Sequence, residues 1–147
     1  MTKEYGSLRE KIAAEKAERT ARYAEFARWI AEADTAGQKA AAECMPIPMV
    51  VVERANPLDD TSPVVREYAP VMDGVCGFAW VKLYDGNSSF ARWAARNAGF
   101  RKGYRSGLEM WVGGYGQSYE RKYAYALAYA GVLQSKGLRA YGDGRLD

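Results

Sequence analysis

Proline is confined to one stretch of this chain, since all five prolines lie between Pro46 and Pro70. Because proline removes a backbone donor and breaks helices, this stretch separates a proline-free N-terminal part from a proline-free C-terminal part. The length of 147 residues fits one domain. The sequence therefore predicts a single domain, 1–147, made of an N-terminal helical arm (7–43), a proline-containing strand and loop segment (44–73) and an α/β core (74–147).

The N-terminal part is rich in Ala, Glu, Lys and Arg, which favour helix. Ser7 and Glu10 have the spacing of a capping box, which predicts that the helix begins after Ser7. Apolar residues recur at helical spacing only later, for example at Phe26 and Ile30. We therefore expect a solvated first half, a packed second half, and an end or a bend at Gly37.

Strands and helices alternate after Gly74. Side chains of the segment 77–84 alternate strictly between two faces, as in a strand: Ala79, Val81 and Leu83 face one way, and Phe78, Trp80, Lys82 and Tyr84 face the other. A helix to Asn97, a strand at 107–113, a helix from Ser118 to Lys136 and a short strand at 138–141 follow, and extended segments at 49–53 and 66–72 precede. The predicted class is α+β: a long N-terminal helix, then a small sheet with two helices on one face (a strand-helix-strand-helix-strand core).

The helix that follows Ser118 carries apolar residues on two sides. Ala126, Leu127 and Leu133 belong to one stripe, whereas Tyr125 and Tyr129 belong to another. A helix with two apolar sides is buried on both. Either the N-terminal helix or another subunit therefore covers Tyr125 and Tyr129, and these tyrosines are a candidate interface of a homo-oligomer.

Residue usage restricts the chemistry that this chain can carry out. It has no histidine, which removes Ser-His and Cys-His nucleophile systems and every histidine-containing metal site. Cys44 and Cys76 stand far apart in sequence and are expected to be reduced thiols. No spacing selects catalytic carboxylates, and we expect neither metal nor cofactor, so the sequence favours a non-catalytic protein without deciding the point. With no membrane-spanning run and no secretory signal, a cytoplasmic location is expected.

The run GGYGQSYERK lies between a predicted strand and a predicted helix. Glycines before a helix N-terminus, followed by cations in the first turn, suit an anion such as phosphate. The run matches neither the P-loop pattern nor G-x-G-x-x-G. A tight strand-to-helix turn therefore remains the alternative to an anion site. The candidate residues are Gly114, Gly116, Ser118, Arg121 and Lys122.

A basic and aromatic stretch, FARWAARNAGFRKGYRS, gives a sharper signal. It lies in the basic part of the chain, since residues 1–84 carry a net charge of −2 and residues 85–147 one of +5. Cations that follow a backbone and aromatic rings that stack on bases are features of single-stranded nucleic-acid binding. The alternative is that the aromatic residues face the core and the arginines only solvate a helix. The candidate binding residues are Arg92, Trp93, Arg96, Phe100, Arg101, Lys102, Tyr104 and Arg105.

The predicted strand at 77–84 matches part of the RNA-recognition pattern K/R-G-F/Y-G/A-F-V-x-F/Y, although Cys76 replaces its basic residue and Leu83 its last aromatic. The strand and helix that would carry the companion motif are missing, which favours chance similarity. The aromatic residues nevertheless have two possible roles. If Phe78, Trp80, Tyr84 and Trp111 lie on an open sheet face, they form a stacking platform. If the N-terminal helix covers that face, they are core.

Several runs together resemble a group of small, uncharacterised proteins encoded by tailed bacteriophages of high-GC hosts. These runs are ARYAEF, PMVV, GVCGFAWVKL, FARW, YGQSYERKYAYALAYAGVLQSKGLRAY and RLD. The resemblance covers most of the chain and implies a phage-encoded protein that acts in the host cytoplasm or in a virion. It transfers no functional residue.

The leading hypothesis is a non-catalytic, phage-encoded accessory protein that binds nucleic acid through the basic and aromatic stretch. The alternative is a protein-binding module, either an inhibitor of a host protein or a virion component. A phosphate-ligand enzyme that uses GGYGQS ranks third.

Overall fold

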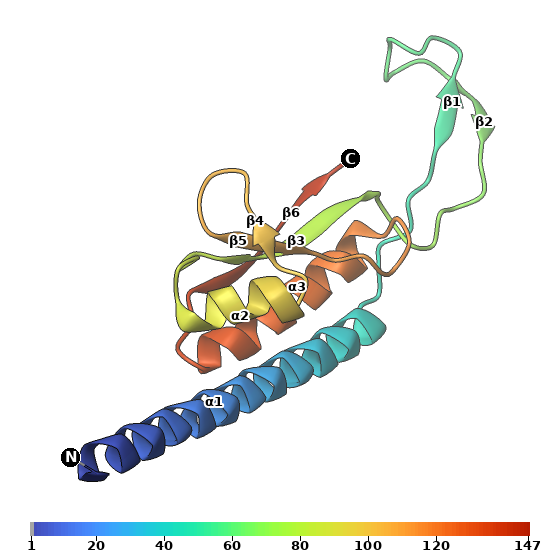
Figure 1. Cartoon of the computed structure of the whole chain (residues 1–147). Helices are drawn as coiled ribbons and strands as arrows, with labels where there is room; N and C mark the ends of the chain where they lie inside the picture. Colours follow the sequence, from blue (N-terminus) through green and yellow to red (C-terminus); the bar gives the residue numbers. More distant parts are fainter. Residues whose placement is uncertain (1) are drawn as a thin grey trace.

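The structure, a computed structural model, describes the backbone of residues 2–147 and the side chains of residues 6–147. It confirms the predicted α+β class, with a long N-terminal helix and two further helices on a small sheet (Figure 1). In chain order the elements are α1 (Thr2–Glu43), β1 (Val52–Arg54), β2 (Val64–Glu67), β3 (Gly77–Leu83), α2 (Ser89–Asn97), β4 (Arg101–Lys102), β5 (Leu108–Trp111), α3 (Tyr119–Ser135) and β6 (Ala140–Leu146).

The body of the protein has three layers. A four-stranded antiparallel sheet in the order β4-β5-β3-β6 forms the first layer. Helices α2 and α3 lie against one face of this sheet, and α1 lies on the far side of α3 (Figure 1). The opposite face of the sheet therefore carries no helix.

The core lies between the sheet and α3. The side chains of Ala79, Val81 and Leu83 alternate along β3 toward the helices and are almost fully buried. They meet small and branched side chains of α3, of which Ala126 and Leu133 are fully buried. The predicted core stripe holds for these residues, but Leu127 points outward and is 48% exposed. It lies at the side of α3 next to the edge strand β6, where the sheet ends and cannot cover it.

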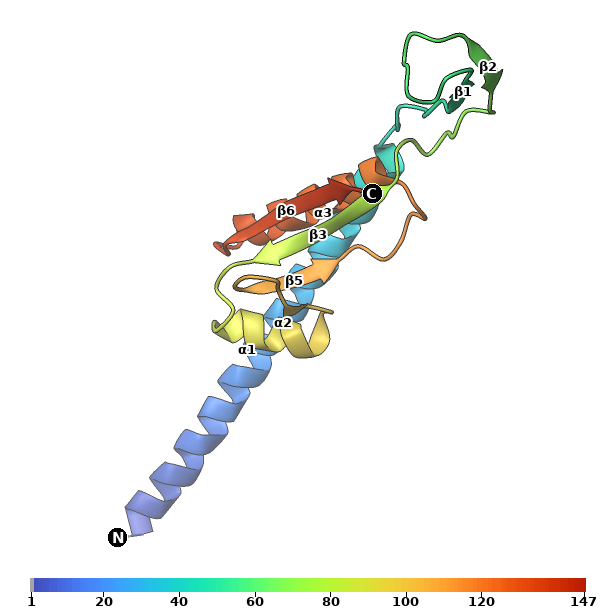
Figure 2. The same ribbon diagram turned by 90° about the horizontal axis from the view of Figure 1, so that it is seen from above.

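Helix α1 is longer than predicted. It begins at Thr2, so the prediction that Ser7 caps it was wrong: Ser7 lies inside the helix, which continues through Gly6 to Thr2. Residues 6–25 are exposed and project beyond the body (Figure 2), as predicted. From Phe26 onward the helix packs antiparallel to α3. Gly37 neither ends nor bends it.

Residues 44–76 leave the body at the end opposite the N-terminus and form a hairpin arm (Figure 2). The predicted extended segments are present but shifted, because β1 and β2 pair at 52–54 and 64–67, with a further bridge between Met49 and Val71. β2 ends three residues before Pro70. Large apolar side chains on this arm are exposed: Met45, Ile47, Val50, Val51, Val52, Leu58, Val64, Val65, Tyr68, Val71, Met72 and Val75.

Candidate nucleic-acid interface

The uncovered face of the four-stranded sheet, called the outer face below, is built by every second residue of its strands. Antiparallel register brings these side chains into rows across the sheet. One row contains Arg101, Glu109, Lys82 and Tyr141. The next rows contain Trp111, Trp80 and Asp143, and then Phe78 and Arg145.

Aromatic side chains dominate the centre of the outer face. The rings of Trp80 and Trp111 stack with centroids 4.8 Å apart and planes 20° apart. Phe78 lies 5.8 Å from Trp111, and Tyr84 lies 5.6 Å from Tyr141. Trp111 is 47% exposed. Because α1 packs on α3 instead of on this face, the first of the two sequence interpretations applies. Phe78, Trp80, Tyr84, Trp111 and Tyr141 form an open aromatic platform.

Cations surround this aromatic platform. The guanidinium of Arg145 lies 5.5 Å from the Phe78 ring centre and 5.9 Å from that of Trp111, which is within the range of a cation–π contact. Arg101 and Arg105 make no ion pair with the described side chains. Asp143 is an exposed carboxylate on this face, so the positive charge is greatest toward β4 and the loop after it.

An ion pair lies beneath that loop. Lys82 Nζ is 3.3 Å from Glu109 Oε1, and the two side chains are only 11% and 15% exposed. The loop 103–107 covers them, and a Cβ at Gly103 would lie 2.6 Å from Lys82 Nζ. The Trp111 indole donates a hydrogen bond to Glu109 Oε2 at 3.2 Å. Lys82 therefore neutralises Glu109, and the Glu109 carboxylate in turn holds the Trp111 ring in place.

Two grooves open on either side of Glu109. One, of about 440 Å³, lies between the aromatic platform and the loop 103–107 and is lined by Trp80, Lys82, Tyr84, Tyr104, Arg105, Ser106, Glu109 and Asp143. The other, of about 410 Å³, lies at the β4 edge and is lined by Gly99, Arg101, Lys102, Glu109 and Trp111. Each groove thus combines a tryptophan with cations, which suits a base and its phosphate.

The structure brings four of the eight predicted binding residues to the two grooves, although Lys102 alternates with Arg101 and pairs with Leu108 on the other side of β4. Arg101, Lys102, Tyr104 and Arg105 line the two grooves. Phe100 is 1% exposed and packs in the core beside Tyr129, so the prediction that it stacks on bases was wrong. Its neighbour Arg101 points the other way because successive residues of a strand face opposite sides.

The remaining predicted residues lie on α2. Trp93 is half-buried against Phe26 of α1, with ring centroids 5.8 Å apart. Arg92 and Arg96 are exposed and face a different part of the surface, between α2 and α1. Sequence reasoning missed Tyr141 and Arg145. Their alternation with Gly142 and Gly144 was a strand signal, because glycines on one side allow close packing of α3.

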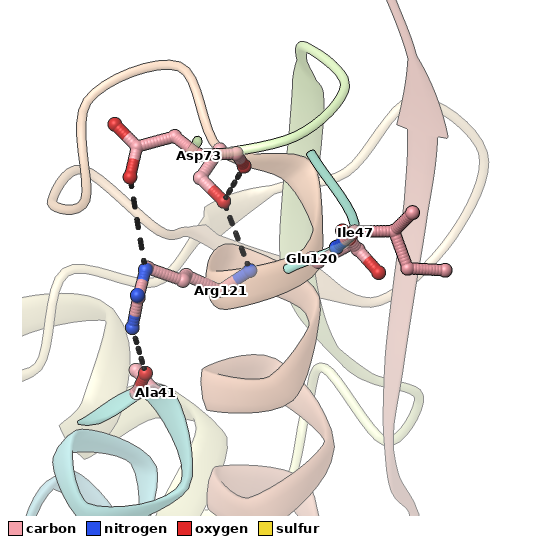
Figure 3. Close-up of polar contacts among 6 residues, drawn as sticks. Ala41, Ile47, Asp73, Glu120 and Arg121 are labelled. Carbon is pink, nitrogen blue, oxygen red and sulfur yellow. Dashed lines mark hydrogen bonds and ion pairs between the residues drawn. The ribbon is translucent and has the colours of Figure 1, made fainter. Parts of the chain in front are cut away.

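The GGYGQS run forms a tight strand-to-helix turn, which was the alternative to an anion site. Ser118 Oγ caps α3 by accepting from Arg121 N at 3.3 Å and donates to the Asp73 carbonyl at 2.7 Å (Figure 3). The Arg121 guanidinium donates to the Ala41 carbonyl at 2.7 Å and lies 3.9 Å from the Asp73 carboxylate. Gly114 and Gly116 belong to the turn, and at Gly116 φ is +57°.

The other groups near this turn are also engaged. Lys122 is buried and donates to the Gly77 carbonyl at 3.3 Å. Glu120 accepts from the Ile47 amide at 2.8 Å (Figure 3), which brings an acidic group to the helix N-terminus. Both predicted cations are therefore committed to the chain itself, and together these contacts clamp the base of the hairpin arm to α3.

Tyr125 and Tyr129 form an internal contact, so the candidate subunit interface at these residues was wrong. They are 9% and 2% exposed beneath α1. The Tyr125 hydroxyl donates to Asp34 Oδ1 at 2.5 Å. Burial raises the pKa of both tyrosines, and the hydrogen bond to Asp34 raises the pKa of Tyr125 further. The N-terminal helix thus covers the second apolar stripe of α3.

The described residues give little support for other kinds of functional site. Cys44 and Cys76 are half-buried free thiols. Within residues 6–147, no group of three or more Cys, Asp or Glu side chains is arranged to hold a metal ion. None of the helices in residues 2–147 has both the length and the apolar character needed to cross a bilayer.

Comparison with known proteins gives no match: no protein-family model, no curated protein and no solved structure is significantly similar to this chain.

Proposed function

We propose that this protein is a non-catalytic accessory protein that binds single-stranded nucleic acid on the outer face of its sheet. The observation that carries the proposal is the open aromatic platform, with Trp80 stacked on Trp111 and cations along the β4 edge and the loop after it. Every base has an aromatic face, so such a platform binds bases with little sequence preference, while arginines follow the phosphates. From the resemblance to phage-encoded proteins, we further propose that it acts in the host cytoplasm, with the virion as the alternative.

An aromatic platform that is open to solvent favours the binding of single strands over the binding of duplex. Bases paired and stacked within a duplex cannot lie flat on Trp111, whereas those of a single strand can. Residues Arg101, Lys102 and Arg105 are close enough to the platform to line the same grooves as the two tryptophans. The proposed arrangement places bases on the aromatic platform and phosphates along β4 and the loop.

The test is binding of a labelled oligothymidylate and of a duplex across a salt series. We expect Trp111→Ala to weaken single-strand binding by between about 5-fold and about 150-fold, the effect of losing one stacked base. Arg101→Glu with Lys102→Glu should weaken it further and reduce the salt dependence, since each lost phosphate contact lowers the slope by about 0.7.

Tyr68→Ala is the matched control for Trp111→Ala. Tyr68 is 46% exposed, almost the same as Trp111, but lies on the hairpin arm. It should leave affinity unchanged, and melting curves should show that all variants are folded. Absence of single-strand binding at low salt, or an equal effect of Trp111→Ala and Tyr68→Ala, would refute the proposal.

A second candidate function, attachment to another protein molecule, is favoured by the hairpin arm. Two-stranded hairpins are marginally stable alone, yet this arm exposes large apolar side chains on residues such as Leu58 and Val65. Exposed patches of this kind mark interaction sites. We propose a second copy of the chain as the partner, because β6 (Ala140–Leu146) offers an unpaired sheet edge to which a strand of the arm can add.

A further inference from the structure

A cleft with four arginines lies between α1 and α2, away from the outer face. It has a volume of about 480 Å³. Its lining residues are Arg19, Arg22, Tyr23, Ser89, Arg92, Trp93, Arg96 and Asn97. No acidic residue lines it. The cleft uses the part of α1 that projects beyond the body, which has no role in the core.

Packing between the two helices fixes the position of these arginines. Phe26 of α1 contacts Phe90 edge-to-face, with centroids 5.2 Å apart, and Trp93 at 5.8 Å. Arg22 precedes Phe26 by one turn, and Arg19 precedes it by two, so both lie on the side of α1 that meets α2. On α2, Arg92 and Arg96 are one turn apart. The aromatic contact thus brings two arginines from each helix together.

No acidic side chain among the described residues lines the cleft to offset its positive charge. None of the four arginines forms an ion pair or a side-chain hydrogen bond with the described residues. Glu15 and Glu18 are near in sequence, but neither lines the cleft. Like charges one turn apart on a helix, such as Arg92 and Arg96, destabilise it. A bound polyanion would offset that repulsion.

The turn from α2 to β4 links the cleft to the groove at the β4 edge along the chain. Its last lining residue on α2 is Asn97, and the groove beside Trp111 begins at Gly99. Gly99 has φ +74°, so the chain turns here directly from α2 into β4. Arg96 of the cleft and Arg101 of the groove therefore lie on either side of this turn, five positions apart in the chain.

We propose that the four-arginine cleft holds the sugar–phosphate backbone of a single strand whose bases lie on the aromatic platform, an inference that rests on the proposed function. The strand leaves the platform at Trp111, passes Arg101 and the turn at Gly99, and enters the cleft. Guanidinium groups bind phosphate in a bidentate manner. The projecting half of α1 thereby becomes part of the binding surface.

The test compares oligothymidylates of about 4 and about 16 nucleotides, the range of site sizes for such surfaces. Arg19→Gln with Arg22→Gln should leave the short oligonucleotide unaffected, because it reaches only the platform. The same variant should bind the long one on the order of tenfold more weakly, with a salt slope lower by about 1.4, or about 0.7 for each lost contact. Arg28→Gln with Lys39→Gln is the matched control, since it removes two exposed cations from α1 that lie outside the cleft.

The two proposals fail in different ways. If neither oligonucleotide binds the unmodified protein, the proposed function fails. If the short one binds in a Trp111-dependent manner but both double variants bind the long one equally, only the cleft proposal is overturned. A melting temperature raised by sodium triphosphate, with long-strand affinity unaffected by the cleft variant, would also overturn it, because the cleft would then take a free phosphate ligand.

Discussion

Gly37 shows how one residue is fixed by a contact that the sequence does not reveal. Glycine inside a helix is normally less stable than alanine by about 1 kcal/mol. At Gly37, however, a Cβ would lie 2.6 Å from two ring carbons of Tyr125. The missing side chain therefore lets α1 lie against the buried tyrosine, and this contact explains why the helix continues through the glycine.

Gly37→Ala should consequently destabilise the protein, by about 1–3 kcal/mol in the free energy of unfolding, the usual cost of overpacking. Gly131→Ala is the control, because a Cβ on this glycine of α3 meets nothing within 4 Å. It should stabilise by about 0.5–1 kcal/mol. Urea unfolding measures both. If Gly37→Ala stabilised as Gly131→Ala does, the close contact with Tyr125 would be wrong.

The two buried tyrosines limit the stability of the fold at alkaline pH. Burial raises the pKa of Tyr125 and Tyr129 above the ordinary value of 10.0. A raised folded-state pKa means that the stability is fully present below pH 10.0 and is lost as pH rises further, since the unfolded state releases its protons first.

We expect the melting temperature to fall steeply above about pH 10, and Tyr125→Phe with Tyr129→Phe to flatten that fall. Circular dichroism melting curves across the alkaline range measure the effect. Tyr104→Phe, on a loop side chain that is 93% exposed, should leave the slope unchanged. An equally steep fall in the double variant would show that other groups set the limit.

At the scale of elements, the positions of strands and helices could be predicted from the sequence more accurately than the faces that they cover. Alternation along β3 assigned Val81 to one side and Trp80 to the other, and the structure agrees. The alternation could not predict which face of the sheet is open to solvent, because that depends on where α1 docks. The docking contacts join residues far apart, such as Tyr125 and Asp34, which are separated by 91 positions.

Only part of the candidate site could be predicted, for a similar reason: its residues are brought together by contacts between distant parts of the chain. Arg101 and Phe100 are neighbours in one basic and aromatic stretch, yet one lines a groove and the other lies in the core. The strand that begins at Arg101, β4, has only two residues and is too short to produce a periodic signal. The GGYGQS turn was ambiguous because the acceptor for Arg121 is the Ala41 carbonyl, which is 80 positions away.

At the scale of the whole molecule, two projections leave the body at opposite ends: the first half of α1 and the hairpin arm (Figure 2). The base of the arm is held by Glu120, Arg121 and Ser118 of the α3 N-terminus and its cap (Figure 3), so the arm points in a defined direction. If the outer face binds a single strand as proposed, a molecule with this face between two extensions is suited to line up copies along that strand. Such an arrangement would let the arm of one copy reach β6 of the next.

This arrangement predicts self-association that depends on the arm. Val52→Thr, Leu58→Ser and Val65→Thr together remove exposed apolar groups and keep the two strands β-branched. We expect the triple variant to weaken association by about tenfold or more, since the loss of a few buried methyl groups exceeds 1.4 kcal/mol. Sedimentation velocity over a concentration series measures this effect, and Ile12→Ser, on an exposed apolar residue of α1 far from the arm and from β6, is the control. If the unmodified protein stays monomeric at every concentration, with or without an oligonucleotide, a second copy is not the partner of the arm.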